Sequence, residues 1–386
     1  MRHPLALTLA LITGCAACAP TAWCADDPGA ATVAAVAAER TPIELAILLD
    51  TSGSMDGLID QARARLWAVV NDVARARRGD RLPDLRVALY EYGNDGIDAT
   101  LGWVRQVVPL TTDLDAISAA LFALRTNGGS EHCGQAIARA VGDLRWTSGD
   151  HYRAVFIAGN EPFTQGPVPF AEACRAAVAK GVLINTIHCG PHGAGVAGCW
   201  SEAARLGGGG ALDIEQDRIQ VAIATPHDER IAALNAKLND TYVAYGALGA
   251  ANVARQAVQD GNAASYGSSS FCDRARSKAG GQYRNHHWDL VDACADPGFD
   301  LASVPDAALP EALRALDAAA RRAHIAAQAA HRAALQAELL AVANAREAHL
   351  AAERARLGHA ADDGLGGAMR ALLRAQLART GYRLDG

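Results

Sequence analysis

Lysine is scarce in this sequence of 386 residues, occurring only at Lys180, Lys237 and Lys278. Almost all positive charge is therefore carried by arginine, and alanine is abundant throughout, a pattern that we attribute to genome composition rather than to function. The net charge is -6. Because a nucleic-acid binder needs a basic surface to neutralise phosphates, the charge argues against a nucleic-acid partner.

Catalytic signatures are missing as well. We find no Gly-x-Ser-x-Gly elbow, no paired general acid and base, and no phosphate-binding glycine loop in the context that each chemistry requires. The glycine run at 206–212 precedes a predicted strand, whereas a phosphate loop follows a strand and opens a helix. The sequence therefore predicts a protein that is not an enzyme. A hydrolase, which would need a reactive serine or bound zinc, is the alternative from the enzyme class.

No long apolar run occurs, and the nearest approach to one is at the N-terminus. Residues 5–12 form a short apolar run after Arg2, which is typical of an export signal and too short for a membrane-spanning helix. We assign residues 1–24 to a signal peptide. Residues 12–15 resemble a bacterial lipobox that would make Cys15 a lipidated residue, and cleavage near Ala25 is the alternative. We therefore expect a periplasmic protein or a lipoprotein of the cell envelope, with membrane contact only through a lipid anchor.

Six cysteines follow the predicted signal peptide, an even number in a compartment that permits disulfides. The sequence does not determine their connectivity, but one arrangement keeps each bridge within one region. Its pairs are Cys133 with Cys174, Cys189 with Cys199, and Cys272 with Cys294. A zinc site is the weaker alternative, because His188 and His192 supply two further suitable ligands beside Cys189 and Cys199.

Residues 43–222 alternate short apolar runs with helical patterns, which indicates a mostly parallel sheet covered on both faces. The buried strands are predicted at 43–49, 86–92, 154–158 and 182–187. Residues 103–110 follow the second strand after a loop too short for a crossover helix, so we expect them to pair antiparallel to it. Helices are expected in the gaps. Their apolar faces would hold Ile59, Ala62, Leu66, Val70 and Val73 in one helix and Ile137, Val141 and Leu144 in another.

The pattern changes after residue 222. We expect an accessory region at 223–308, with an exposed loop at 261–270, and then a mainly α-helical, alanine-rich extension at 309–386. No Gly or Pro interrupts residues 311–357, which predicts a long helix or a helical hairpin. Its apolar stripe is short, and its nearly balanced charges predict a solvated face. The stripe consists of Leu335, Leu339 and Val342.

The clearest chemical motif is Asp50-x-Ser52-x-Ser54, directly after the first predicted strand. An open α/β sheet forms its ligand crevice at the carboxyl ends of its strands. Carboxylate and hydroxyl oxygens at alternate positions of a tight loop suit Mg²⁺ or Mn²⁺. The alternative is a loop that only caps the helix after it.

By this motif and by its order of strands and helices, the region 41–222 resembles the von Willebrand factor type A (vWA) family. The resemblance implies an α/β fold with a Rossmann-like, doubly wound, mostly parallel sheet. It also implies protein binding through a metal-ion-dependent adhesion site. In that family the first loop supplies the ligands matched here by Asp50, Ser52 and Ser54, while a threonine and an aspartate come from two further loops. The region after residue 226 is similar to segments of bacterial envelope proteins, which suggests that 226–308 packs on the vWA region.

Only the first loop matches the family pattern. In the second loop Glu131 takes the place of the threonine, although Thr126 is close enough in sequence to compete. In the third loop Ala158 and Gly159 replace Thr-Asp, and Asn160 follows them. The expected ligands of Mg²⁺ or Mn²⁺ are Asp50, Ser52, Ser54, Glu131 and Asn160. We expect an exported protein that binds protein partners or takes part in envelope assembly, and the alternative is a scaffold without metal.

Overall fold

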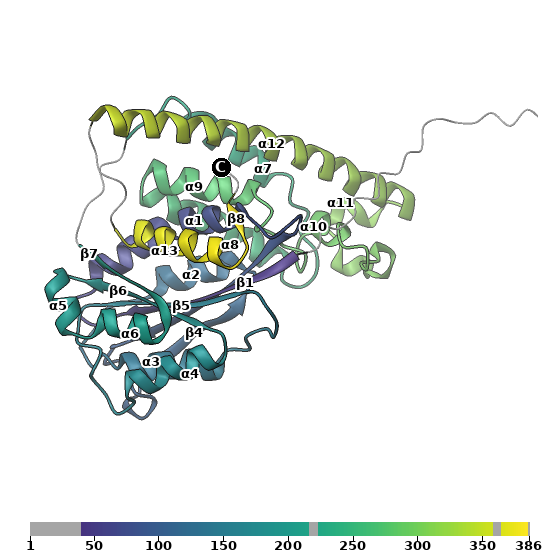
Figure 1. Ribbon diagram of the computed structural model, residues 1–386. Coiled ribbons are helices and arrows are strands. Elements are labelled where there is room, and N and C mark those ends of the chain that lie inside the picture. The colour runs from purple at the N-terminus through teal and green to yellow at the C-terminus, as the bar shows by residue number, and fades with distance from the viewer. Residues whose placement is uncertain (1–39, 216–222, 358–363, 385–386) are drawn as a thin grey trace, which may run out of the picture. The chain divides into compact units, whose positions relative to one another are not determined.

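A six-stranded sheet lies at the centre of the computed structural model, which describes residues 40–215, 223–357 and 364–384 (Figure 1). Its strand order is β4-β3-β1-β5-β6-β7. Neighbouring strands pair parallel except β3 and β4, which are antiparallel. The four predicted buried strands and the antiparallel partner are therefore confirmed. The strands are β1 (Arg40–Asp50), β3 (Leu82–Tyr92), β4 (Val104–Thr111), β5 (Tyr152–Gly159), β6 (Leu183–Cys189) and β7 (Gly208–Ile214).

Helices cover both faces of this sheet because successive side chains of a strand point to opposite faces. Ile47 of β1 belongs to a core shared with α1 (Asp56–Ala74) and α2 (Leu114–Ala123). Leu48 belongs to a second core, shared with α3 (Cys133–Asp143) and α4 (Phe170–Ala179). Burial on both faces explains why the strands read as continuous apolar runs. The predicted helix faces in α1 and α3 are buried as expected.

The C-terminal helix completes one of these cores. Helix α13 (Leu365–Arg379) packs against α1, β6 and β7, and Met369, Leu373 and Leu377 are buried in the same cluster as Ile47. After it, β8 (Arg383–Leu384) pairs antiparallel with β2 (Ala76–Arg77). The core of the sheet therefore combines residues 40–215 with residues 365–384.

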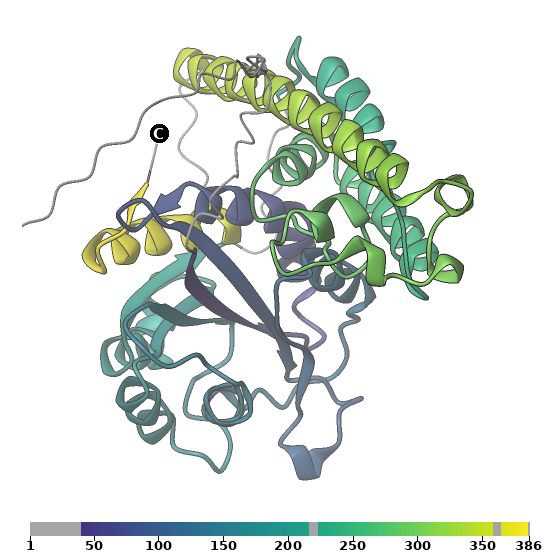
Figure 2. The ribbon, with the colours of Figure 1, turned by 90° about the vertical axis from the view of Figure 1, so that its right-hand side faces the viewer.

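Helices also form the part of the chain between β7 and α13. Helix α12 (Ala318–Leu357) packs on α7 (Asp228–Asn239) and α9 (Ser268–Ala279) (Figure 2). Helix α9 also contacts α1, and α8 (Gly249–Ser265) contacts α2. The short helices α5 and α6 belong to the sheet region and lie between β6 and β7. The bounds are α5 (His192–Ala197), α6 (Trp200–Leu206), α7 (Asp228–Asn239), α8 (Gly249–Ser265), α9 (Ser268–Ala279), α10 (Leu290–Cys294), α11 (Glu311–Arg314) and α12 (Ala318–Leu357).

The exposed loop predicted at 261–270 is wrong. These residues form the end of α8 and the start of α9, separated by a break at Tyr266 and Gly267. Gly267 has φ +94°, a conformation that glycine adopts without steric cost. Ala263 and Ser270 of this segment are buried, and their packing favours helix despite the weak intrinsic propensity of the glycine and serine residues around them.

The long helix predicted within 311–357 is confirmed as α12, a single helix of 40 residues. Leu335 and Leu339 are buried as expected, but Ala343 rather than Val342 is the third buried member of the stripe. The predicted solvated face is only partly correct, because Arg332 and Arg346 are buried. Each forms ion pairs that offset its burial. Arg332 pairs with Asp289 at 2.6 Å and Asp292 at 2.8 Å, and Arg346 pairs with Asp228 at 2.8 Å.

The six cysteines within the described ranges are free thiols, so the three predicted disulfides are not formed. Cys189 lies in the core on one face of the sheet, whereas Cys199 packs against the core on the other face. Cys272 and Cys294 likewise contact separate clusters, while Cys133 and Cys174 share one cluster without bonding. Burial raises the pKa of the Cys174 and Cys272 thiols to about 12. These cysteines therefore pack as small apolar side chains.

The predicted signal peptide at 1–24 and the lipobox cysteine Cys15 lie outside the described residues. Among the helices that the structure does describe, none is long and apolar enough to cross a membrane.

Candidate functional site

Three loops meet where β1 ends at Asp50. The parallel register places Asp50 beside Tyr92, the last residue of β3. The Asp50 side chain is buried, and its Oδ1 accepts a hydrogen bond of 2.8 Å from the Ser52 amide. The amide of Gly53 donates to the Gly128 carbonyl at 2.7 Å, which fastens the first loop to the second. Hydrogen bonds from backbone amides thus fix the conformation of the Asp50 loop.

The predicted ligands of the first and third loops lie together. The hydroxyls of Ser52 and Ser54 are 3.4 Å apart, and the Asn160 amide nitrogen donates to Ser54 Oγ at 3.3 Å. Two oxygens at this point are buried, Asp50 Oδ2 and Asn160 Oδ1, and neither has a hydrogen-bond partner among the residues described. A buried polar atom without a partner carries a desolvation cost, so both oxygens can accept a further ligand.

Glu131 is the residue of the second loop that approaches Asp50. Both side chains adjoin Gly93, where an added Cβ would lie 2.8 Å from Asp50 Oδ1 and 3.0 Å from Glu131 Cγ. Thr126, the competing candidate, instead donates its hydroxyl to the carboxylate of Asp56. The structure thus places Glu131 near Asp50, whereas Thr126 contacts Asp56 at the start of α1.

The pKa values of the Asp50 and Glu131 carboxyl groups are both raised. Burial raises the pKa of Asp50 to about 7, hydrogen bonds from Ser52 oppose this, and repulsion from Glu131 and Glu161 adds to it. Burial also raises the pKa of Glu131, with repulsion from Glu161 and Asp95 contributing. Since the folded-state pKa of Asp50 exceeds its unfolded value, the folded form loses stability as pH rises from about 4 to about 7. A cation beside Asp50 would remove this penalty.

Tyr92 explains why the third loop carries Gly159 in place of an aspartate. The Tyr92 hydroxyl donates to the Ala158 carbonyl at 2.9 Å. A Cβ added to Gly159 would lie only 2.4 Å from that hydroxyl and 2.9 Å from Asp50 Oδ2. Any side chain at residue 159 would therefore clash, because the tyrosine fills the space that it would need.

The oxygen atoms present fit a hard divalent cation. Carboxylates, hydroxyls and an amide oxygen are ligands that Mg²⁺ and Mn²⁺ accept, and no nitrogen or sulfur atom is needed. No group of three or more His, Cys, Asp or Glu side chains suited to a metal occurs within residues 40–215, 223–357 and 364–384. A cation at Asp50 would thus depend on the serine and asparagine oxygens as well as on the carboxylates.

The alternative zinc ligands are arranged differently. His188 Nδ1 lies 3.2 Å from Asp213 Oδ1, and His192 Nδ1 lies 2.6 Å from Asp213 Oδ2. Both imidazoles thus hydrogen-bond to one carboxylate, and Cys189 and Cys199 pack on opposite faces of the sheet. The four residues do not converge on one point.

Sequence reasoning missed three residues that shape the site. They are Tyr92, Gly93 and Asp95, all at or after the end of β3. Asp95 lies so close to Gly128 that an added Cβ there would be 2.0 Å from its carboxylate. The predicted strand at 86–92 could have indicated these residues, because it runs parallel to the strand that ends at Asp50 and must end at the same edge of the sheet.

Comparison with known proteins gives only remote likenesses. No protein-family model matches the sequence, and no curated protein matches it. BatB, a conserved hypothetical protein of Bacteroides thetaiotaomicron, is 17% identical with a TM-score of 0.34, over 45% of this chain and 90% of that one. An aerotolerance-related membrane protein of Bacteroides fragilis is 16% identical with a TM-score of 0.31, over 45% and 93%. A von Willebrand factor type A protein of Catenulispora acidiphila is 17% identical with a TM-score of 0.34, over 45% and 39%.

Values this low carry no functional argument, so the fold is identified from the chain's own topology. Numbered along the chain, the six strands of the sheet have the order 3-2-1-4-5-6, that of doubly wound nucleotide-binding sheets. The third strand runs antiparallel at the edge, and the Asp50 loop lies at the carboxyl end of the first. These features give the chain the Rossmann-like, doubly wound, mostly parallel α/β fold that its resemblance to the von Willebrand factor type A family implies.

Proposed function

We propose that this protein binds protein partners in the cell envelope through a modified divalent-cation site at the carboxyl end of β1. The observation that carries the proposal is the buried Oδ2 atom of Asp50, which has no hydrogen-bond partner among the residues described. A buried carboxylate normally has a paired charge, but Asp50 is repelled by two other carboxylates, Glu131 and Glu161.

In this proposal Asp50, Ser52 and Ser54 hold Mg²⁺ or Mn²⁺, with Glu131 and Asn160 at the rim. The cation would supply positive charge between two carboxylates and a coordination position for a partner group. Glu131 provides the second negative charge that Gly159 cannot provide, because Tyr92 occupies that space. The site keeps its charge balance with a changed ligand geometry.

The envelope location rests on the predicted signal peptide and lipobox of the sequence.

Two other functions remain as alternatives. A structural scaffold would bind its partners without any dependence on divalent cations. A hydrolase would require a reactive nucleophile, and we find no support for one in the geometry around Asp50.

Affinity capture from envelope extract, with full-length protein as bait, tests the proposed function. We expect specific partners to be retained in millimolar Mg²⁺, to be lost on adding a chelator, and to be lost with Asp50→Ala. Glu202→Ala is the matched control, since this exposed glutamate lies on α6 and should change nothing. Partners that are retained equally under all of these conditions would support the scaffold instead.

A further inference from the structure

A pocket of about 560 Å³ lies beside the cation site, between α1, the end of α2 and the end of α8. Its lining includes Asp56, Asp60, Phe122 and Tyr266. Asp56 follows the first ligand loop directly and accepts the hydrogen bond from Thr126 of the second. This volume is within the range of ordinary ligand sites. The pocket therefore adjoins two loops of the site and one helix from the region after β7.

Two arginines line this pocket, and both donate to backbone carbonyls. Arg63 donates to the carbonyls of Leu121 at 3.0 Å and Leu124 at 2.9 Å, and to Asp60 Oδ1 at 3.1 Å. Arg125 donates one nitrogen, Nη1, to the carbonyls of Phe122 at 3.0 Å and Leu124 at 2.7 Å. Both guanidinium groups are thus held against the backbone at the end of α2.

The acceptors, in contrast, keep free capacity. Asp60 receives both the Arg63 nitrogen and the Tyr266 hydroxyl, the latter at 2.6 Å, on Oδ1 alone. Asp56 accepts from Thr126 on Oδ1 alone, and Asn262 uses only its amide nitrogen, toward Gln259. Within the described part of the chain, no hydrogen bond reaches Asp56 Oδ2, Asp60 Oδ2 or the side-chain oxygen Oδ1 of Asn262. The pocket therefore favours a ligand that donates several hydrogen bonds.

Two aromatic rings form the apolar part of the wall. Phe122 and Tyr266 meet edge to face with ring centroids 5.5 Å apart, and the Arg63 guanidinium lies 5.7 Å from the Phe122 centroid. Flat aromatic surfaces beside carboxylates suit a planar cation, which stacks on rings and donates to oxygens in one plane.

The carboxyl edge of the sheet beside the pocket is acidic, although Arg63 and Arg125 line the pocket itself. The loops at the carboxyl edge of the sheet (50–56, 93–103, 124–132, 159–169, 190–199 and 213–215) contain one arginine, Arg125, and no lysine. A field of one sign favours approach of the opposite charge. The acidic residues of these loops are Asp50, Asp56, Asp95, Asp98, Glu131, Glu161, Asp213 and Glu215.

We propose that the protein partner presents a basic segment to this edge and places an arginine side chain in the pocket. The existence of the partner rests on the proposed function, whereas the preference for arginine rests on the pocket itself. A guanidinium carries five donors in a fixed plane, which matches the free oxygens of Asp56, Asp60 and Asn262. Its planar face suits the aromatic wall of the pocket, where the Arg63 guanidinium already lies over the Phe122 ring.

Two probes of the same shape test this preference on the full-length protein. N-acetyl-arginine amide carries the charged guanidinium, and N-acetyl-citrulline amide replaces it with a neutral urea. In calorimetric titrations we expect the arginine probe to bind and the citrulline probe to bind at least about tenfold more weakly, because charge-assisted hydrogen bonds are the stronger class. Equal binding of the two probes, or no binding of the arginine probe, overturns the proposal.

Matched variants locate the binding. Asp60→Asn should weaken the arginine probe about tenfold, since it removes the charge and keeps the shape. Tyr266→Phe removes the hydrogen bond to Asp60 but keeps the carboxylate, so binding should change little. If Asp60→Asn fails to fold by circular dichroism, Asp56→Asn takes its place. An unchanged affinity in the folded aspartate variant contradicts the assignment. If the arginine probe binds but partner capture does not depend on Mg²⁺, the cation site is wrong and the pocket assignment stands. If partner capture depends on Mg²⁺ but the arginine probe does not bind, the pocket assignment is wrong and the cation site stands.

Discussion

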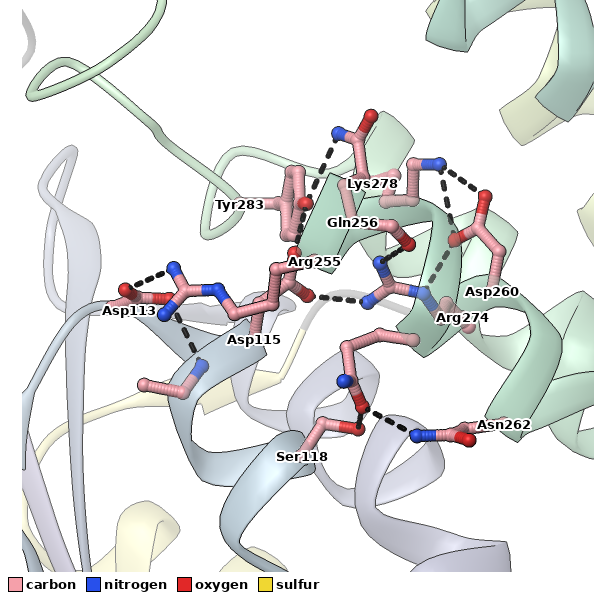
Figure 3. Close-up of polar contacts among 12 residues, drawn as sticks. Asp113, Asp115, Ser118, Arg255, Gln256, Asp260, Asn262, Arg274, Lys278 and Tyr283 are labelled. Carbon is pink, nitrogen blue, oxygen red and sulfur yellow. Dashed lines mark hydrogen bonds and ion pairs between the residues drawn. The ribbon is translucent and has the colours of Figure 1, made fainter. Parts of the chain in front are cut away.

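Replacing Arg274 with methionine is expected to lower the free energy of unfolding by about 3–5 kcal/mol. Arg274 is buried on α9, where it pairs with Asp115 of α2 at 2.7 Å and with Asp260 of α8 at 2.6 Å (Figure 3). Its guanidinium also lies 4.6 Å from the ring centroid of Trp67 on α1. The substitution would leave Asp115 without its ionic partner in a buried environment, and Asp260 with Lys278 as its remaining ionic partner.

Urea unfolding of wild type and variant measures this effect. Arg205→Met is the matched control, because Arg205 lies on α6 with 70% of its side chain exposed and pairs with an exposed glutamate. We expect the control to change stability by no more than about 0.5 kcal/mol. A similar small loss for Arg274→Met would show that the ion pairs between α2, α8 and α9 do not hold these helices together.

Leu373→Ala is expected to destabilise the protein by about 2–5 kcal/mol. Leu373 lies on α13, almost at the end of the chain, yet it is 1% exposed in the core that also contains Ile47 and Leu66. Truncation would open a cavity between α13 and the sheet, and surrounding side chains collapse only partly into such a cavity.

Leu357→Ala provides the comparison within the same part of the chain. Leu357 ends α12 and is 47% exposed, so its loss should cost no more than about 0.5 kcal/mol. Thermal or urea unfolding of both variants would distinguish the positions. Equal effects would mean that α13 is not part of the sheet's core.

Local patterns were sufficient to predict five of the six strands of the sheet, whereas the glycine run that we expected to precede the sixth lies largely inside it, in β7. The strands β1, β3, β5 and β6 each contain a short apolar run, and the loop between β3 and β4 is too short for a crossover helix. The Asp50 motif was visible for the same reason, since its residues are adjacent in sequence. Such features depend only on neighbours along the chain.

Long-range contacts were not predictable from the same patterns. Nothing in the composition of 365–379 distinguishes a helix packed on α1 from a solvated one, because the partner face lies about 300 residues away in sequence. In the sequence, Arg332 and Arg346 have the pattern of surface charges, because their aspartate partners lie far away along the chain. The sequence showed that Gly159 lacks the expected carboxylate, but only the register of β1 and β3 reveals that Tyr92 takes the space.

Unfolding free energies of wild type and Asp50→Asn, measured with and without millimolar Mg²⁺, test the modified cation site most directly. Without Mg²⁺ at about pH 8 we expect the variant to be more stable by on the order of 2–4 kcal/mol, because the buried carboxylate is ionised only in wild type. At about pH 4 the difference should vanish, since Asp50 is then protonated in the folded state. Mg²⁺ at pH 8 should stabilise wild type and leave the variant unchanged. Wild-type stability that does not respond to Mg²⁺, together with an Asp50→Asn difference that does not depend on pH, would contradict a cation site at Asp50.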